Sequence, residues 1–221
     1  MAEWLYEAGI GEARAALIDG AIVEARIELA GLRAGTVAEG RLRAGGRVEL
    51  AGGEVLLDPV PRGVPEGGLV TVRITREAIP EPGRAKLAQA VARDDAPAPG
   101  PDLLARIAAT GIPVRRCRAH EPDLLEQAGW SEALEEARTG EIAFPGGALR
   151  MSVTPAMTLF DVDGTLAPEP LALAAARAVA AAIVRHGIAG SIGVDFPTRA
   201  DKTARLGVAV VIDAALPQPF E

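Results

Sequence analysis

The sequence of 221 residues predicts a mixed α/β protein that carries a small inserted β-barrel. Short apolar segments separated by glycine pairs fill residues 32–93, and this spacing is typical of a small all-β domain. Residues 157–196 instead pass from an apolar strand through a long alanine-rich helix to a second strand. That order is typical of a crossover unit, which places two parallel strands side by side. A proline-rich linker at residues 94–100 separates the two patterns, so we expect an α/β region at residues 101–221.

The first 31 residues are predicted to form a β-hairpin. Strand-like apolar runs are found at Trp4–Glu7, Ala13–Ile18 and Ala21–Leu29. The dipeptide Asp19-Gly20 separates the last two runs, and Asp-Gly between apolar runs is a strong hairpin signal.

The segment 32–93 is predicted to be a small barrel of the oligonucleotide-binding (OB) type. Its expected strands are Thr36–Leu42, Arg47–Leu50, Glu54–Leu57 and Leu69–Thr75, with glycine pairs at the turns. The segment contains no Phe, Tyr or Trp on which nucleic-acid bases could stack. Binding to a nucleic acid would therefore depend on phosphate contacts and be weak and sensitive to salt. The alternative is a β insert that binds nothing.

Residues 101–153 are predicted to alternate short helices and strands. Asp102 is expected to cap a helix that ends at Gly111, and Ser131 a helix that continues to Arg138. Residues 113–118 indicate a strand or a basic connector, and a Pro-Gly-Gly turn at 145–147 joins two strands. Beyond the acidic strand, we expect helices at 171–186 and from 198, although 208–212 fits a strand equally well.

Three aspartates follow the two strands of the crossover unit. Asp161 and Asp163 alternate with Phe160 and Val162 and therefore point to the same side of their strand. Asp195 closes the second strand, so all three carboxylates are expected to converge at one edge of the sheet. Neighbouring carboxylates repel one another unless a cation lies between them, and oxygen ligands favour Mg²⁺, with Mn²⁺ as the second candidate.

Composition narrows the class of protein. A net charge of −7 argues against capture of nucleic acid by overall charge, so local basic patches would have to bind it. The single cysteine, Cys117, excludes an internal disulfide and a multi-cysteine zinc site, which fits a reducing cytoplasm. We find no signal peptide and no apolar run of ~18 residues, so we expect a soluble cytoplasmic protein with no membrane partner. Cys117 with His120 is a weak candidate for a nucleophile pair, and His186 fits a helix cap better than a catalytic base.

Several of these segments together resemble the ribonuclease E/G family. The similar residues are Pro145-Gly146-Gly147-x-Leu149, then Thr154 to Asp163, then Gly190 to Phe196. Ile10 to Leu17 resembles the opening hairpin of that family, and the glycine-rich β segment takes the place of its inserted S1 domain.

The resemblance implies a Mg²⁺-dependent endoribonuclease that cleaves single-stranded RNA during RNA processing or turnover. Asp161 and Asp195 match the metal-binding aspartates of the family. Asp163 stands where the family often has an asparagine, and we count it as a third catalytic candidate. The implied products carry a 5′-phosphate and a 3′-hydroxyl. The candidates for binding RNA are the basic residues Arg76, Arg84, Lys86 and Lys202.

Some modules of that family have no counterpart in this sequence. We find no pocket that would sense a 5′-monophosphate, and no Cys-x-x-Cys pair that would link subunits through zinc. Oligomerisation would need another device.

Two alternatives remain open. Asp161-Val162-Asp163-Gly164-Thr165 also resembles the first motif of haloacid-dehalogenase-type phosphatases, in which Asp161 would be the nucleophile and Asp163 the general acid/base. The chain after Leu166 is short for that fold and contains one lysine, Lys202. The second alternative is a non-catalytic RNA-binding homologue of the nuclease.

Overall fold

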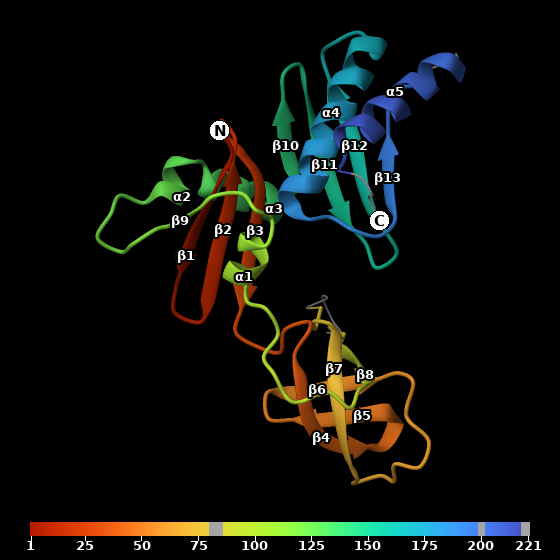
Figure 1. Cartoon of the computed structure of the whole chain (residues 1–221). Helices are drawn as coiled ribbons and strands as arrows, with labels where there is room; N and C mark the ends of the chain where they lie inside the picture. Colours follow the sequence, from red (N-terminus) through yellow and green to blue (C-terminus); the bar gives the residue numbers. More distant parts are fainter. Residues whose placement is uncertain (80–85, 199–201, 218–221) are drawn as a thin grey trace. The chain divides into compact units, whose positions relative to one another are not determined.

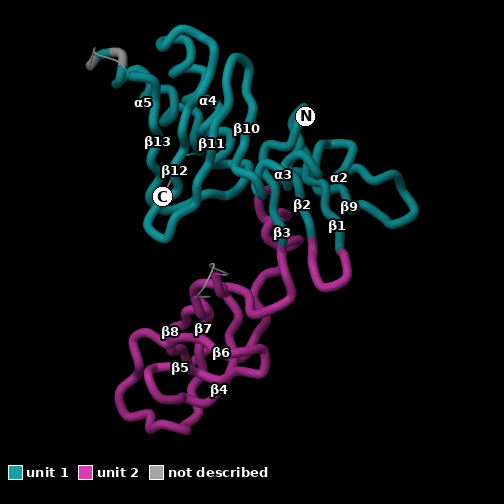
Figure 2. The backbone as a smooth tube through the Cα atoms, turned by 180° about the vertical axis from the view of Figure 1, so that it is seen from behind, with its two compact units in different colours: residues 1–8, 14–27, 112–221 teal, residues 9–13, 28–111 magenta. Residues whose placement is uncertain are grey.

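The computed structural model describes residues 1–79, 86–198 and 202–217 of the chain (Figure 1). They form two compact units, which Figure 2 shows in different colours. Unit 1 comprises residues 1–8, 14–27 and 112–221, and unit 2 comprises residues 9–13 and 28–111. The mixed α/β class with a small barrel is confirmed.

Unit 2 is built on a closed five-stranded barrel in the order β4-β5-β6-β8-β7. Its strands are β4 (Val37–Arg43), β5 (Arg47–Leu50), β6 (Gly53–Leu57), β7 (Leu69–Arg76) and β8 (Ala88–Ala92). Neighbouring strands are antiparallel except β6 and β8, which are parallel. This arrangement is compatible with an OB-like barrel. All five strands lie inside the segment 32–93.

The barrel core consists of small branched side chains. Val48, Val55 and Val72 are fully buried, and Ile74 and Leu57 are almost so. These residues alternate with polar ones along their strands, as expected when one face of each strand points inward. The sequence pattern did not predict β8, because Ala-Gln-Ala-Val-Ala has weak β propensity. Pairing with β6 and β7 on either side makes this segment a strand.

The rest of unit 2 follows the barrel. A short 3₁₀ turn (Ala44–Gly46) joins β4 to β5, and helix α1 (Leu103–Ala108) comes after the proline-rich segment. The carboxylate of Asp102 accepts a hydrogen bond from the Ala105 amide at 2.7 Å, so the predicted cap is confirmed.

Unit 1 contains a first sheet in the order β3-β2-β1-β9. Its strands are β1 (Glu3–Ala8), β2 (Glu12–Ile18), β3 (Ile22–Leu29) and β9 (Val114–Arg116). β9 is the strand that was expected within 113–118, and it runs parallel to β1. Helices α2 (Leu124–Gln127) and α3 (Trp130–Thr139) pack on this sheet through Leu125 and Trp130. The prediction of Ser131 as the cap of α3 was wrong: Gly129 precedes the helix, and the Ser131 hydroxyl donates to Glu126 at 2.7 Å.

The second sheet of unit 1 has the order β10-β11-β12-β13. Its strands are β10 (Glu141–Phe144), β11 (Gly147–Val153), β12 (Thr158–Gly164) and β13 (Ile192–Asp195). β10, β11 and β12 are antiparallel to one another, whereas β12 and β13 are parallel. Helix α4 (Pro168–His186) makes the crossover between the parallel strands and covers one face of the sheet.

Helix α5 (Lys202–Ala215) packs on α4, where Val208 meets Ala172 and Ala176 (Figure 1). Residues 208–212 are therefore helical, and the strand alternative for them was wrong. Within the described ranges, no helix has the length and apolar character needed to cross a membrane.

Candidate functional site

The exposed face of the second sheet carries the predicted aspartates. In β12, Phe160 and Val162 are buried against α4, and this orientation turns Asp161 and Asp163 to the opposite, exposed face. In β13, Asp195 is the exposed last residue. The register pairs Asp161 directly with Asp195 on the adjacent parallel strand. Two residues 34 positions apart along the chain therefore lie side by side, as the crossover pattern predicted.

The register extends this pair into a row of charged residues across all four strands. Glu141 of β10 pairs with Arg150 of β11, and Arg150 pairs with Asp161 of β12. The row therefore reads Glu141, Arg150, Asp161, Asp195, with all four side chains exposed. Asp163 lies two residues beyond Asp161 on β12 and pairs with Ala148 of β11.

Arg150 is held within this row by Glu141. Its Nε donates to Glu141 Oε1 at 2.9 Å. This hydrogen bond and the charge of Glu141 raise the pKa of Arg150, and the charges of Asp161 and Asp163 add to the increase. The guanidinium of Arg150 is thus within the electrostatic field of the two aspartates of β12.

An open depression of about 580 Å³ lies at this row. Its lining includes Arg150, Asp161 and Asp195 together with the apolar side chain of Leu159. Leu159 is 41% exposed and lies over Gly193, where a Cβ would come within 2.7 Å of Leu159 Cδ2. The face thus combines an acidic pair, one guanidinium and an apolar floor.

The turn of the β10–β11 hairpin packs tightly against the end of β12. A Cβ at Gly164 would lie 2.6 Å from the Gly146 carbonyl oxygen and 2.5 Å from Leu171 Cδ1. The Thr165 amide donates to the same Gly146 oxygen at 3.1 Å. Gly146 in the hairpin turn and Gly164 at the end of β12 therefore have a packing role. Their small size allows the end of β12, the hairpin turn and α4 to come into contact.

The donor set of this face suits a hard divalent cation. Asp161 and Asp195 present carboxylate oxygens from neighbouring strands, and Mg²⁺ usually takes one or two carboxylates while water and substrate phosphates complete its shell. Within the described part of the chain, no group of three or more His, Cys, Asp or Glu residues could hold a metal together. The face therefore fits a magnesium ion bound by two carboxylates and lacks the donors of a closed protein cage.

The residues predicted to bind RNA are placed only in part. Arg76 donates to the Gln89 side chain and, at 3.0 Å, to the Leu87 carbonyl, so internal contacts already use its guanidinium. Lys86 is exposed, and its backbone pairs with Ile79. Arg84 and the side chain of Lys202 lie outside the described residues.

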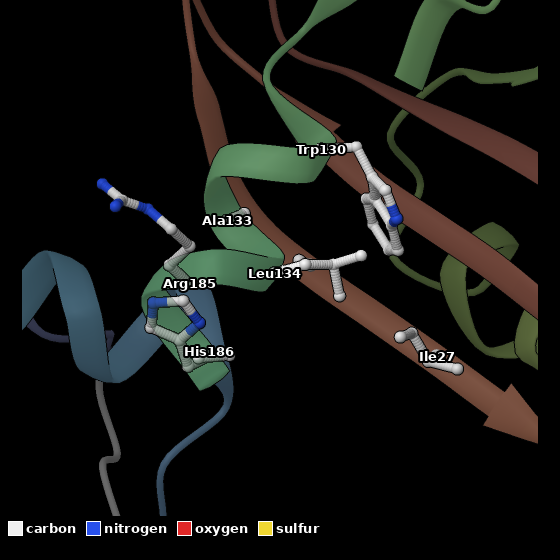
Figure 3. A pocket seen from close by; sticks show the side chains of 8 residues that line it. Ile27, Trp130, Ala133, Leu134, Arg185 and His186 are labelled. Carbon is white, nitrogen blue, oxygen red and sulfur yellow. The ribbon is translucent and has the colours of Figure 1, made fainter. Parts of the chain in front are cut away.

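His186 has a structural environment at the end of α4. Its imidazole is 8% exposed and lies 3.2 Å from Glu136 Oε2, to which Arg185 also donates. Figure 3 shows Arg185 and His186 beside a pocket of about 220 Å³, which is also lined by Trp130, Leu134 and Ile27. Its described lining is mainly apolar and includes none of the three aspartates, so the pocket does not support a role for His186 as their catalytic base.

Cys117 is poorly suited to nucleophilic attack. Burial raises the pKa of its thiol, and the negative charge of Glu7 raises it further, whereas Arg115 acts in the opposite direction with less effect. A raised pKa keeps the sulfur in its unreactive thiol form. This environment argues against the Cys117–His120 pair.

Sequence reasoning missed Glu141 and Arg150 as parts of this face. The alternation around buried Leu149 already places Arg150 on the exposed side of β11, but the two charges meet Asp161 only through the strand register. The two-residue turn Pro145-Gly146 was the sequence signal from which the pairing of Glu141 with Arg150 could have been predicted.

Comparison with known proteins does not extend the motif resemblance, since neither a family model nor a curated protein sequence matches this chain.

Proposed function

We propose that this protein is a metal-dependent endoribonuclease that cleaves single-stranded RNA. The in-register pairing of Asp161 with Asp195 on adjacent parallel strands carries the proposal. Like-charged residues directly opposite each other destabilise a sheet, so an exposed aspartate pair of this kind is best explained by a cation that joins the two carboxylates. The motif resemblance to the ribonuclease E/G family supplies the reaction class.

In this mechanism the carboxylates of Asp161 and Asp195 would hold Mg²⁺ at the open face. The chemistry that a bound Mg²⁺ would supply is polarisation of a water molecule and stabilisation of negative charge on the scissile phosphate. Asp163, on the same side of β12, orients the water or accepts its proton. The exposed position of the row leaves room for a single RNA strand to lie across the sheet.

The phosphatase alternative is less well supported by the setting of the motif. β12 has an antiparallel neighbour, β11, on one side and a single parallel neighbour, β13, on the other. β12 is thus one of four strands in a mixed sheet that α4 covers on one face, whereas the phosphatase chemistry depends on a helix-rich α/β domain around the motif.

The test is cleavage of a labelled single-stranded RNA in the presence of Mg²⁺. We expect Asp161→Asn and Asp195→Asn each to lower the rate by at least about 100-fold. Each substitution removes a charged ligand of the metal ion that stabilises the transition state. Asp123→Asn is the matched control, because asparagine caps α2 as well as aspartate does and the rate should not change.

Other results would point elsewhere. Release of phosphate from small phosphoesters, with a trapped aspartyl-phosphate, would replace the proposal with the phosphatase. RNA binding without cleavage in either Mg²⁺ or Mn²⁺ would leave a non-catalytic RNA-binding protein.

A further inference from the structure

Arg150 is the one cationic side chain among the described residues that line the acidic depression. It stands next to Asp161 in the cross-strand row and is 63% exposed. The reaction proposed above requires an anionic phosphodiester to approach a face with four carboxylates: Glu141, Asp161, Asp163 and Asp195. A fixed positive charge at this position would reduce the repulsion.

The guanidinium of Arg150 is oriented from one side only. Its Nε donates to Glu141, and within the described residues no hydrogen bond is found for its two Nη atoms. An arginine fixed through Nε presents its terminal N–H groups as a fork, and this geometry suits two oxygens of a phosphate.

A purely stabilising role does not account well for this arginine. Exposed ion pairs contribute only about 0–1 kcal/mol, and Glu141 is itself 53% exposed. The pair Arg138–Glu135 on α3 is somewhat more exposed, at 73% and 57%, and lies on a different element, so it serves as the reference pair.

We propose that Arg150 binds a phosphate of the RNA strand beside the one that is cleaved, with Glu141 as the residue that positions its guanidinium. The proposal rests on the function proposed above and names the part of that site which contacts the substrate. Asp161 and Asp195 hold the metal, and Arg150 fixes the register of the strand across β11 and β12. The role requires the fork as well as the charge, so lysine should replace it only in part.

The test is the affinity for a fluorescent single-stranded RNA, measured by anisotropy in Ca²⁺, with the integrity of the RNA checked on a gel. We expect Arg150→Gln to weaken binding about 5- to 20-fold and Arg150→Lys to restore part of the loss. The slope of log affinity against log salt should become shallower by about 0.7, the value for one lost phosphate contact on a single strand. Arg138→Gln should change neither quantity.

A set of RNAs with one neutral methylphosphonate linkage each locates the contact. For the wild-type protein, one linkage beside the cleavage site should weaken binding, and Arg150→Gln should be insensitive to that same substitution. An arginine with a merely structural role would not produce this coupling.

The outcomes separate this inference from the function it rests on. Suppose that the wild type cleaves RNA, and that Arg150→Gln has the same RNA affinity and the same salt slope as Arg138→Gln. The role of Arg150 is then excluded, and the nuclease stands. If binding depends on Arg150 without any cleavage, the phosphate contact of Arg150 is supported, while its place beside a cleaved phosphate and the nuclease are both excluded. If the wild type neither binds nor cleaves RNA, both are excluded.

Discussion

At the scale of single residues, the central feature is two aspartates that are direct neighbours on adjacent strands. Asp161 and Asp195 are paired in register, so their carboxylates repel each other, although both are exposed and water weakens this repulsion. Arg150 lies on the other side of Asp161, but its ion pair is with Glu141, and the charge of Asp161 has a smaller effect on it. The uncompensated negative charge of the two aspartates would favour the binding of a divalent cation.

The proposed metal site gives a prediction that can be tested without RNA. Mg²⁺ should raise the unfolding temperature of the wild type, because a ligand present at 100 times its Kd stabilises the folded state by about 2.7 kcal/mol. Asp161→Asn should lose this response while becoming more stable without metal by up to about 1 kcal/mol, since a like-charge repulsion is removed. Thermal unfolding with and without Mg²⁺ measures both effects. An equal response to Mg²⁺ in the variant and the wild type would contradict the assignment of Asp161 as a ligand.

At the scale of elements, the two sheets of unit 1 are linked where α3 meets the end of α4. Glu136 of α3 accepts a hydrogen bond from Arg185 and contacts His186, both on α4. Burial raises the pKa of Glu136, but the hydrogen bonds from His186 and Arg185 and the charge of Arg185 outweigh it. The net result is a pKa below the ordinary value of 4.5.

This shift predicts how acid affects the link. A carboxyl with a lowered pKa in the folded state stabilises the fold above its unfolded pKa, and the contribution disappears as the pH falls through the folded pKa. Glu136→Gln should therefore cost about 1–2 kcal/mol of unfolding free energy near neutral pH, and this cost should shrink as the pH falls below about 4.5. Urea titrations of both proteins over that range measure the difference. A cost that stays constant into acid would show that the charge of Glu136 does not stabilise the fold.

At the scale of the whole molecule, the chain forms two units with separate hydrophobic cores. Among the described residues, the cluster that forms the barrel core has no member in common with the three clusters of unit 1. The barrel also carries many of the arginines, but Arg43, Arg47 and Arg73 each pair with a neighbouring carboxylate. With a net charge of −7, the protein as a whole does not attract RNA, so the RNA binding proposed above would depend on a few specific contacts.

The separation of the cores can be tested with a single methyl group. A Cβ at Gly40 would lie 2.4 Å from the Glu49 carbonyl oxygen, inside the contact between β4 and β5, so Gly40→Ala should cost about 1–3 kcal/mol. Hydrogen exchange should then accelerate in β4 to β8 and stay unchanged in β10 to β13. Gly207→Ala is the matched control, because a Cβ there would meet no described atom within 4 Å beyond its chain neighbours and the nearby backbone of α5, and alanine favours a helix by about 1 kcal/mol. Faster exchange in both units of Gly40→Ala would mean that they unfold together.

Much of this architecture could be predicted from local signals. Alternation of Phe160 and Val162 with Asp161 and Asp163 indicated the buried and exposed faces of β12, and Asp102 indicated the start of α1. The misses have physical causes. β8 is alanine-rich and becomes a strand only because two neighbours pair with it, and residues 208–212 are helical because Val208 packs on α4. The prediction of Ser131 as a cap was wrong because α3 begins at Trp130, so Ser131 lies inside the helix, where its hydroxyl donates to Glu126.

What the sequence alone determined is the set of groups that could do chemistry: two short strands ending in aspartates, joined by a helix of the right length to make them parallel. What only the tertiary structure decided is which charges face one another. The pairing of Asp161 with Asp195, and of Arg150 with both Asp161 and Glu141, depends on strand register. Register is set by the packing of Leu149, Phe160 and Val162 against α4, because a slip of one residue would turn these apolar side chains to water.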